Sequence, residues 1–183
     1  LLDDFLKVPS GGAHEQFAVA AFLGAMLDQF SSGSLQGLQV RTKNINASDA
    51  SSGTGGDVQI IRGNLIEAVF EVSANDWRSK VDQAIEAARR TGLQSAHIIA
   101  AGADISDLGR QLQGSTVDVT VSEVGPFLRV ICSTLRPPAR EDALRRLYDM
   151  LDRLQPNIAL TNGYVELLGR HALAAERPPE DLI

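Results

Sequence analysis

Apolar and polar residues alternate over residues 55–80 in a pattern that predicts two antiparallel strands followed by a helix. The first strand opens at Asp57, and a tight turn at Arg62-Gly63-Asn64 leads into a second strand over residues 65–72. Side chains of a strand alternate between its two faces. One face is therefore expected to carry Val69, Glu71 and Ser73, and the other Ala68, Phe70 and Val72.

An almost entirely apolar segment, residues 13–30, predicts a buried helix after the chain break at Ser10-Gly11-Gly12. Glu15 lies on the same helical stripe as Val19, Phe22 and Met26, so its carboxyl group is expected to point toward the core. A carboxylate in that position is either satisfied by a local partner or belongs to a functional site. The sequence leaves both interpretations open.

Further strands are indicated at residues 38–43, 95–101 and 117–121. An amphipathic stripe predicts a helix over residues 77–91, with Asn75 or Asp76 as its cap and Gly92 as its end. A shorter helix is expected at residues 104–112. The polar loop 44–56, which contains Asp49, leads to Asp57, and loops of this length are either functional or mobile linkers.

The pattern becomes helical from residue 122 onward, with helices predicted at 123–135, 139–154 and 157–173 and a break at Pro137-Pro138. The chain is therefore expected to be an α/β protein. Residues 1–121 are expected to form an α/β core, residues 122–175 a helical extension packed on it, and residues 176–183 a loosely held tail.

Composition narrows the class of protein. A chain of 183 residues, 44% hydrophobic and 22% charged, suits one soluble globular domain. Cys132 is the single cysteine, which excludes a disulfide framework within the chain and favours a reducing, cytoplasmic setting. Because it lies in an apolar run, it is predicted to be a core thiol. The sequence contains no run of about 18 apolar residues, so no membrane helix is predicted. The first residue is not Met, which fits one domain of a longer protein or defence complex.

The charge balance gives two opposite indications about nucleic acid. The net charge of −6 argues against capture of DNA by the field of the whole surface. Fourteen arginines stand against three lysines, and arginine holds phosphate in a bidentate fork. A solvated helix face explains such arginines equally well.

Two acidic residues of the hairpin are expected to meet. A turn at Gly63 places Asp57 opposite residues 69–71, so Asp57 and Glu71 come together at one end of the hairpin. Two carboxylates held close repel each other unless a proton, a cation or water intervenes, so the pair invites a divalent cation. On these grounds Asp57→Ala is expected to leave metal-free stability unchanged or higher. The alternative is a turn residue at Asp57 and a solvated strand residue at Glu71.

The order helix, three strands, helix, strand, with Asp57 opening the second strand and Glu71 near the end of the third, resembles the PD-(D/E)xK nuclease superfamily. The stretches AHEQFAVAAFLGAML, NASDASSGTGGDVQI and EAVFEVS resemble SacI-type restriction endonucleases within it. The resemblance implies a restriction-endonuclease-like core with a helical C-terminal part. It also implies Mg²⁺-dependent hydrolysis of DNA in a restriction or phage-defence system, with Asp57 and Glu71 as Mg²⁺ ligands. Glu15 is implied as a further metal contact, and a homodimer is expected by analogy.

The chain departs from that pattern at Ser73, which stands where the family has a lysine two residues after the Glu. Serine cannot supply a cation. Lys80 is the expected replacement, because its long stem can return the amine to the end of the strand, and Lys43 is the second choice. If neither reaches the site, the domain is expected to be a catalytically inactive nuclease fold that binds DNA or a protein partner. A regulatory domain with a partner surface on its C-terminal helices is the third interpretation.

Overall fold

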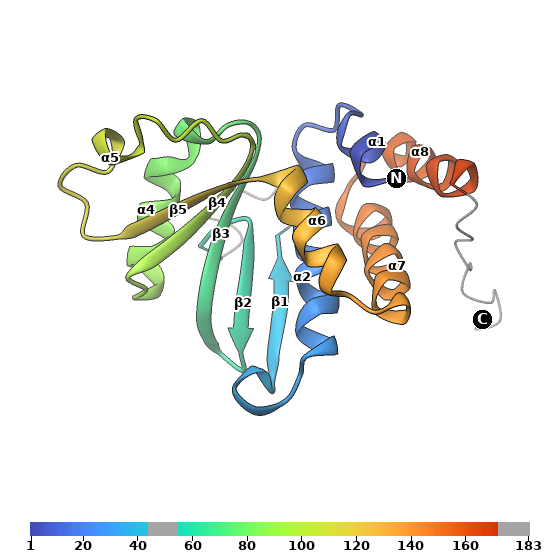
Figure 1. Cartoon of the computed structure of the whole chain (residues 1–183), viewed down its shortest axis with the longest axis horizontal. Helices are drawn as coiled ribbons and strands as arrows, with labels where there is room; N and C mark the ends of the chain where they lie inside the picture. The colour runs from blue at the N-terminus through green and yellow to red at the C-terminus, as the bar shows by residue number, and fades with distance from the viewer. Residues whose placement is uncertain (44–54, 172–183) are drawn as a thin grey trace.

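The computed structural model describes residues 1–43 and 55–171. Most of the predicted loop 44–56, with Asp49, and the whole predicted tail 176–183 lie outside these residues. The described part is a mixed α/β fold in which one five-stranded sheet has helices on both faces (Figure 1). The α/β prediction is therefore confirmed.

The sheet follows the chain from strand to strand in the order β1-β2-β3-β4-β5. Its first three strands, β1 (Leu38–Thr42), β2 (Val58–Arg62) and β3 (Leu65–Asp76), form an antiparallel meander. The last two, β4 (Ser95–Gly102) and β5 (Asp118–Glu123), run parallel to β3. Parallel neighbours need a crossover connection, which is provided by α4 (Val81–Thr91) and by a segment with the short α5 (Leu108–Gln111).

The predicted hairpin is confirmed. Gly63 sits in the turn with φ 60°, a left-handed conformation that glycine adopts without strain. In the resulting register Val58 lies opposite Phe70. Asp57 directly precedes β2, and its backbone N–H donates to the carbonyl of Phe70 at 2.8 Å. The register shifts by one residue between Ile60 and Ile61, so the turn and this irregularity together fix which residues of β3 lie beside Asp57.

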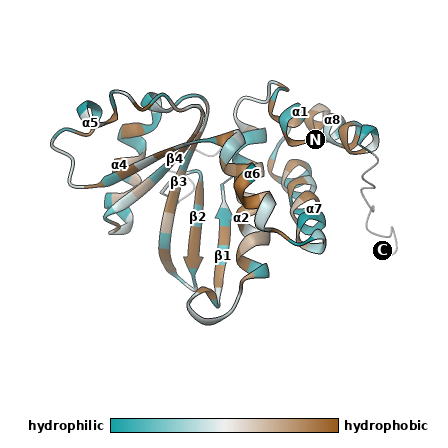
Figure 2. Ribbon diagram, in the orientation of Figure 1, coloured by the Kyte–Doolittle hydropathy of each residue, from teal (hydrophilic) through white to brown (hydrophobic). Residues whose placement is uncertain are grey.

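The alternation along β3 separates two hydrophobic clusters, one on each face of the sheet. Val69 packs with Ile98 of β4 against α4. Phe70 and Val72 pack with Ile99 in the cluster that contains α2 (Ala13–Gln29). Figure 2 shows mostly apolar residues along β2 and β3, as expected for strands that are covered on both faces.

The α2 helix is buried on almost all sides, because it lies between the sheet and two C-terminal helices. Fourteen of its 17 residues are buried, which confirms the prediction of a buried helix. It packs on β1 and on α6 (Val124–Thr134) and α7 (Pro137–Leu154) (Figure 1). The helices α1 (Leu2–Leu6) and α8 (Ile158–Arg170) join the same cluster through Phe5 and Tyr164.

Several predicted boundaries are corrected. The helix expected at residues 77–91 begins as a 3-10 turn, η2 (Trp77–Lys80), because the Asp76 side chain caps it by accepting from the N–H of Arg78 at 2.8 Å. The helix expected at residues 104–112 shortens to α5. The prolines do not separate two helices by themselves: α7 starts at Pro137, since the missing N–H of a proline is no loss in the first helical turn. A short 3-10 helix, η1 (Gly33–Leu35), was not predicted.

Two smaller predictions also have an outcome. Cys132 is half-buried and packs against the cluster around α2, as expected of a core thiol. Within residues 1–43 and 55–171, no helix is long and apolar enough to cross a membrane.

Candidate active site

The backbone of Asp57 is held from three sides. Its N–H donates to Phe70 of β3 at 2.8 Å, and its carbonyl accepts from the N–H of Lys43 at 3.3 Å. The same carbonyl accepts from the Thr42 hydroxyl at 3.1 Å and from the Gln16 amide of α2 at 3.5 Å. Asp57 therefore has a fixed position between β1, β3 and α2.

Two glycines before Asp57 let the chain pass between β3 and α4. Gly56 has φ 91°, and a Cβ there would lie 3.1 Å from the carbonyl oxygen of Phe70. A Cβ on Gly55 would lie 3.2 Å from the carbonyl oxygen of Ala87 in α4. The Gly55 carbonyl accepts from the buried Gln59 amide at 2.8 Å. A larger residue would push the chain, and Asp57 with it, out of this position.

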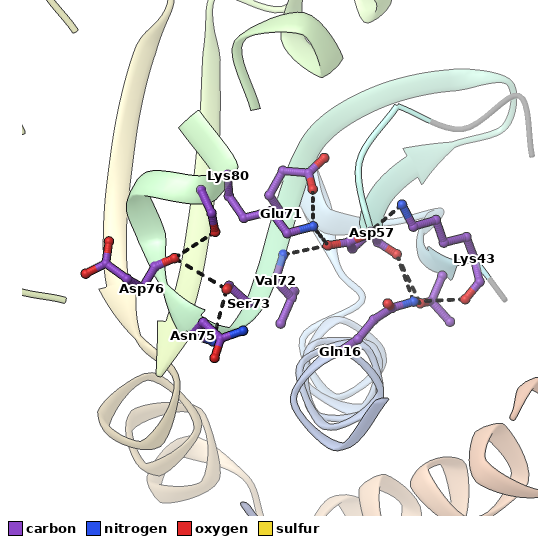
Figure 3. Close-up of polar contacts among 11 residues, drawn as sticks. Gln16, Lys43, Asp57, Glu71, Val72, Ser73, Asn75, Asp76 and Lys80 are labelled. Carbon is purple, nitrogen blue, oxygen red and sulfur yellow. Dashed lines mark hydrogen bonds and ion pairs between the residues drawn. The ribbon is translucent and has the colours of Figure 1, made fainter. Parts of the chain in front are cut away.

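The predicted pair of carboxylates converges on one lysine (Figure 3). Glu71 of β3 lies on the face that packs on α4 and is only 2% exposed, while Asp57 is 4% exposed. Lys80, the last residue of η2, places Nζ 3.0 Å from Asp57 Oδ2 and 3.1 Å from Glu71 Oε2. The backbone N–H of Val72 also donates to Asp57 Oδ2, at 2.8 Å.

The second predicted lysine reaches the same carboxylate from the opposite side. Lys43, directly after β1, places Nζ 2.7 Å from Asp57 Oδ1, and its side chain is 11% exposed. The order of contacts is therefore Lys43, Asp57, Lys80, Glu71, with two ammonium groups and two carboxyl groups. Both lysines contact Asp57, and Lys80 bridges to Glu71.

The two carboxyl groups titrate in opposite directions. Burial by itself raises the pKa of Asp57, but the charges of Lys80 and Lys43 and the N–H of Val72 outweigh burial and hold that pKa below its ordinary value. Burial, and then the negative charge of Asp57, raises the pKa of Glu71 to about 7, with Lys80 opposing. Burial lowers the pKa of Lys80, yet both carboxylates more than compensate and raise it. Near neutral pH, Asp57 is ionised, Lys80 is protonated and Glu71 is close to its titration point.

The donor set fits a divalent cation. Carboxylate oxygens are preferred ligands of Mg²⁺, and Asp57 Oδ2 and Glu71 Oε2 already converge on one positive nitrogen. Glu71 also lines a hollow of about 210 Å³ between Gly55-Gly56 and α4, so there is space beside its carboxyl group. Among the residues that the structure describes, no three His, Cys, Asp or Glu side chains are grouped to hold a metal ion. An ion here would complete its coordination with water or substrate, as Mg²⁺ commonly does.

The other two predicted site residues have local partners. Ser73 Oγ accepts from the N–H of Asn75 at 3.1 Å and lies 3.5 Å from the carbonyl of Asp76, so it shapes the end of β3 (Figure 3). Glu15 accepts from the hydroxyl of Ser10 at 3.2 Å, and burial raises its pKa. The structure does not bring Glu15 into a three-acid group with Asp57 and Glu71. Its predicted metal contact stays a prediction.

Sequence reasoning missed Gln16, the α2 side chain nearest to Asp57. Its amide donates to the Thr42 hydroxyl and to the Lys43 carbonyl, both at 2.9 Å, in addition to the carbonyl of Asp57. It thereby ties α2 to the ends of β1 and β2. The signal in the sequence was that Gln16, an uncharged polar residue, stands beside Glu15 at the start of a mostly apolar helix.

The matching region of a known family includes this whole site. Residues 1–103 match the family model of the SacI restriction endonuclease C-terminal domain. That stretch covers α1 to β4, with Asp57, Glu71, Lys43 and Lys80. A comparison with curated proteins gave no match. Because the matched stretch is more than half of the chain, the protein belongs to the SacI restriction endonuclease C-terminal domain family.

Proposed function

We propose that this domain is a Mg²⁺-dependent DNA endonuclease of the PD-(D/E)xK type, with Asp57 and Glu71 as metal ligands and Lys80 as the motif lysine displaced onto η2. The observation that carries the proposal is the position of Lys80 Nζ, within 3.1 Å of an oxygen of each carboxylate. Membership of a restriction endonuclease family supports the same reading.

The order of elements supports the PD-(D/E)xK assignment. The core would consist of α2, the meander β1 to β3, α4 and β4, which is the order that the sequence resemblance implies. Asp57 directly precedes β2 and Glu71 lies in β3, which supports the assignment of the two acids to the motif. The lysine comes from the next element along the chain, and the α6–α8 helices form the additional C-terminal part.

The residues of the site would divide the chemistry as follows. Mg²⁺ supplies Lewis-acid stabilisation of a phosphate and activates water for attack. Asp57, kept ionised by its two lysines, and Glu71, once deprotonated, would hold the ion. Lys80 Nζ, a protonated amine with 21% of its side chain exposed, can turn from the carboxylates toward a phosphate oxygen whose negative charge increases in the transition state. Lys43 would keep Asp57 in place.

The test uses the small number of lysines in the chain. Lys80→Ala is expected to reduce Mg²⁺-dependent cleavage of plasmid DNA by about a hundredfold or more, because it removes an electrostatic stabiliser of the transition state. DNA binding is expected to change much less. Lys7→Ala is the matched control, since that lysine is 77% exposed and pairs only loosely with Asp4 at 3.9 Å. Cleavage by Lys80→Ala at the parental rate would reject the assignment of Lys80 and make Lys43→Ala the next variant.

A second function is favoured by one observation. The motif position holds Ser73, and Lys43 and Lys80 together already neutralise the two carboxylates, so the site is internally compensated without a metal. An inactive nuclease-fold domain that binds DNA or a protein partner would look the same. Titration calorimetry with Mg²⁺ separates the two: an active enzyme binds the ion through Asp57, and Asp57→Asn abolishes that heat. If the parental protein binds DNA but no Mg²⁺, the binding function is the correct one.

The proposed enzyme implies further properties of the assembly. Cleaving both strands of a duplex takes two active sites, so a twofold homodimer is proposed for the active form. The same family relationship supports a proposed role in restriction or phage defence, within a longer chain or a complex. Sedimentation with and without a DNA duplex tests the dimer.

A further inference from the structure

A second cluster of charged groups lies at the start of η2, away from the two carboxylates. The guanidinium of Arg78 donates to both oxygens of Asp107, through Nε at 3.1 Å and Nη2 at 2.5 Å. Its Nη1 donates to Asp76 Oδ2 at 2.6 Å, and the group stacks over the Trp77 ring at 4.8 Å. This is a bidentate arrangement, which is the most specific geometry that arginine makes with a carboxylate.

The cluster joins η2 to the segment that follows β4. Trp77 is fully buried, and its ring N–H donates to the carbonyl of Asp104 at 2.9 Å. Arg78 also donates to that carbonyl at 3.3 Å. Asp104 and Asp107 belong to the connection between β4 and β5. Trp77 and Arg78 of η2 are therefore hydrogen-bonded to the connection between β4 and β5, which is about 27 residues away in sequence.

The turn needs such support because it is short. η2 has four residues and continues directly into α4 at Val81, so the helix supports its end and the contacts of Trp77 and Arg78 support its start. Trp77 and Arg78 anchor its start, while Lys80, its last residue, projects to Asp57 and Glu71. The lysine stem is long and flexible, so the site of its amine depends on where the η2 backbone is held.

Ser73 contributes to the same support. Its hydroxyl accepts from the N–H of Asn75 at 3.1 Å and lies 3.5 Å from the Asp76 carbonyl, which also accepts from Ser79 Oγ at 3.0 Å. A lysine has no acceptor and could not receive the N–H of Asn75. The residue in the motif position thus shapes the exit from β3 into the turn that carries Lys80.

We infer that Arg78, clamped by Asp107, is a positioning residue for Lys80, and that Ser73 assists it by shaping the turn. The inference deepens the proposed function and rests on it for its catalytic meaning. Its structural content, that the Arg78–Asp107 ion pair keeps the Lys80 amine between the two carboxylates, stands separately and can be measured without any substrate.

The experiment measures the reactivity of the three lysines. Reductive methylation of metal-free protein, read by peptide mass spectrometry, reports how accessible each amine is. Lys80 is expected to react slowly in the parental protein and about tenfold faster in Arg78→Gln and in Asp107→Asn, because each variant removes a charge-assisted fork. Lys7, which is exposed, is the internal reference and is expected to keep its rate. Asp107→Glu, which retains the carboxylate, is expected to stay within about threefold of the parental rate.

The matched control is Arg129→Gln, which breaks a guanidinium–carboxylate pair with Asp3 far from η2. It is expected to leave the Lys80 rate unchanged. Unchanged Lys80 reactivity in Arg78→Gln and Asp107→Asn, with both variants folded, overturns the inference. If Arg78→Gln does not fold, Asp107→Asn decides, because it conserves size and removes only the charge.

Cleavage kinetics give the catalytic readout. Arg78→Gln and Asp107→Asn are expected to reduce kcat about tenfold or more while KM for DNA stays within about twofold, as for loss of an interaction made in the transition state. A matching rise in KM with kcat unchanged would assign Arg78 to DNA binding and overturn its positioning role. If the parental protein does not cleave DNA, the proposed function fails, and the methylation rates still decide whether Arg78 positions Lys80.

Discussion

The two faces of β3 are built from different kinds of interaction. On the face toward α2, Phe70 and Val72 pack in an apolar cluster with Ile99. On the face toward α4, Glu71 is almost fully buried and accepts from the ammonium group of Lys80. The same ammonium group also donates to Asp57. The same strand therefore carries a stabilising core on one face and a buried set of charges on the other.

The two faces of β3 contribute differently to stability and to function. Burying apolar side chains stabilises a fold, whereas burying charged groups is costly unless each group is paired, and even then an apolar replacement is often as stable. Burial, and then the charge of Asp57, opposes ionisation of Glu71 and raises its pKa to about 7, in line with this cost. A strongly perturbed acid beside a hollow is a candidate for a functional site. The apolar face is expected to respond to mutation through stability, and the charged face through both stability and activity.

The largest expected effect on stability belongs to the apolar face. Phe70→Ala is expected to lower the free energy of unfolding by about 3 to 5 kcal/mol, because it removes a buried ring and leaves a cavity. Urea unfolding measures the change. Val130→Ala, at an exposed apolar residue of α6, is the control and is expected to change stability by less than about 0.5 kcal/mol. A loss below about 1 kcal/mol in Phe70→Ala would contradict the contrast between the faces.

Asp57→Asn is expected to destabilise the metal-free protein by about 2 to 4 kcal/mol near pH 8, since it leaves two largely buried ammonium groups without their shared counter-charge. This corrects the expectation from sequence that removing Asp57 relieves repulsion. Lys43, Lys80 and the N–H of Val72 all contact that carboxylate and lower its pKa, so the ionised form stabilises the fold. Unfolding of Asp57→Asn at the parental urea concentration would restore the earlier view. Asp3→Asn, at an exposed ion pair, is expected to have little effect.

Glu71→Gln is expected to act with the opposite sign. The folded-state pKa of Glu71 is raised from 4.5 to about 7, so its stabilising contribution is complete below about 4.5 and is lost as the pH rises through about 7. Parental metal-free protein should therefore lose stability across this window relative to Glu71→Gln. Urea unfolding in the presence of a chelator, at several pH values from about 5 to 8, measures the two curves. Parallel curves would mean that Glu71 does not titrate in this range.

The smallest expected effect is a partial rescue. Ser73→Lys in the Lys80→Ala background is expected to recover cleavage about threefold to tenfold, because the new amine starts from the same strand as Glu71. Recovery stays incomplete, since the substitution also removes the acceptor for the N–H of Asn75. Ser73→Met in the same background is the control for side-chain length without charge. Equal rates for the two double variants would exclude a role for charge at residue 73.

The hairpin and the buried helix were predictable because their signals are local. The alternation over residues 65–72 and the Gly63 turn predict that β2 pairs with β3, while a register shift between Ile60 and Ile61, which was not predicted, sets the final alignment of Asp57 with β3. The helix over residues 13–30 was predictable because it has apolar residues on every side. For the same reason its orientation was not predictable, since a helix without a polar face does not indicate which residue points to the site. The sequence favours Glu15 as the site residue of this helix, whereas in the structure Gln16 contacts the Asp57 backbone.

By itself, the sequence determined the antiparallel meander, the meeting of Asp57 and Glu71 at the end of the hairpin opposite the turn, and the presence of Ser73 rather than a lysine two residues after Glu71. Only the tertiary structure decided that both remaining candidates, Lys43 and Lys80, reach Asp57 and that Lys80 also bridges to Glu71. The reason is physical. Register follows from near neighbours in the chain, but the position of a flexible amine depends on an anchored turn, and that anchor lies in a segment after β4 that no local pattern connects to it.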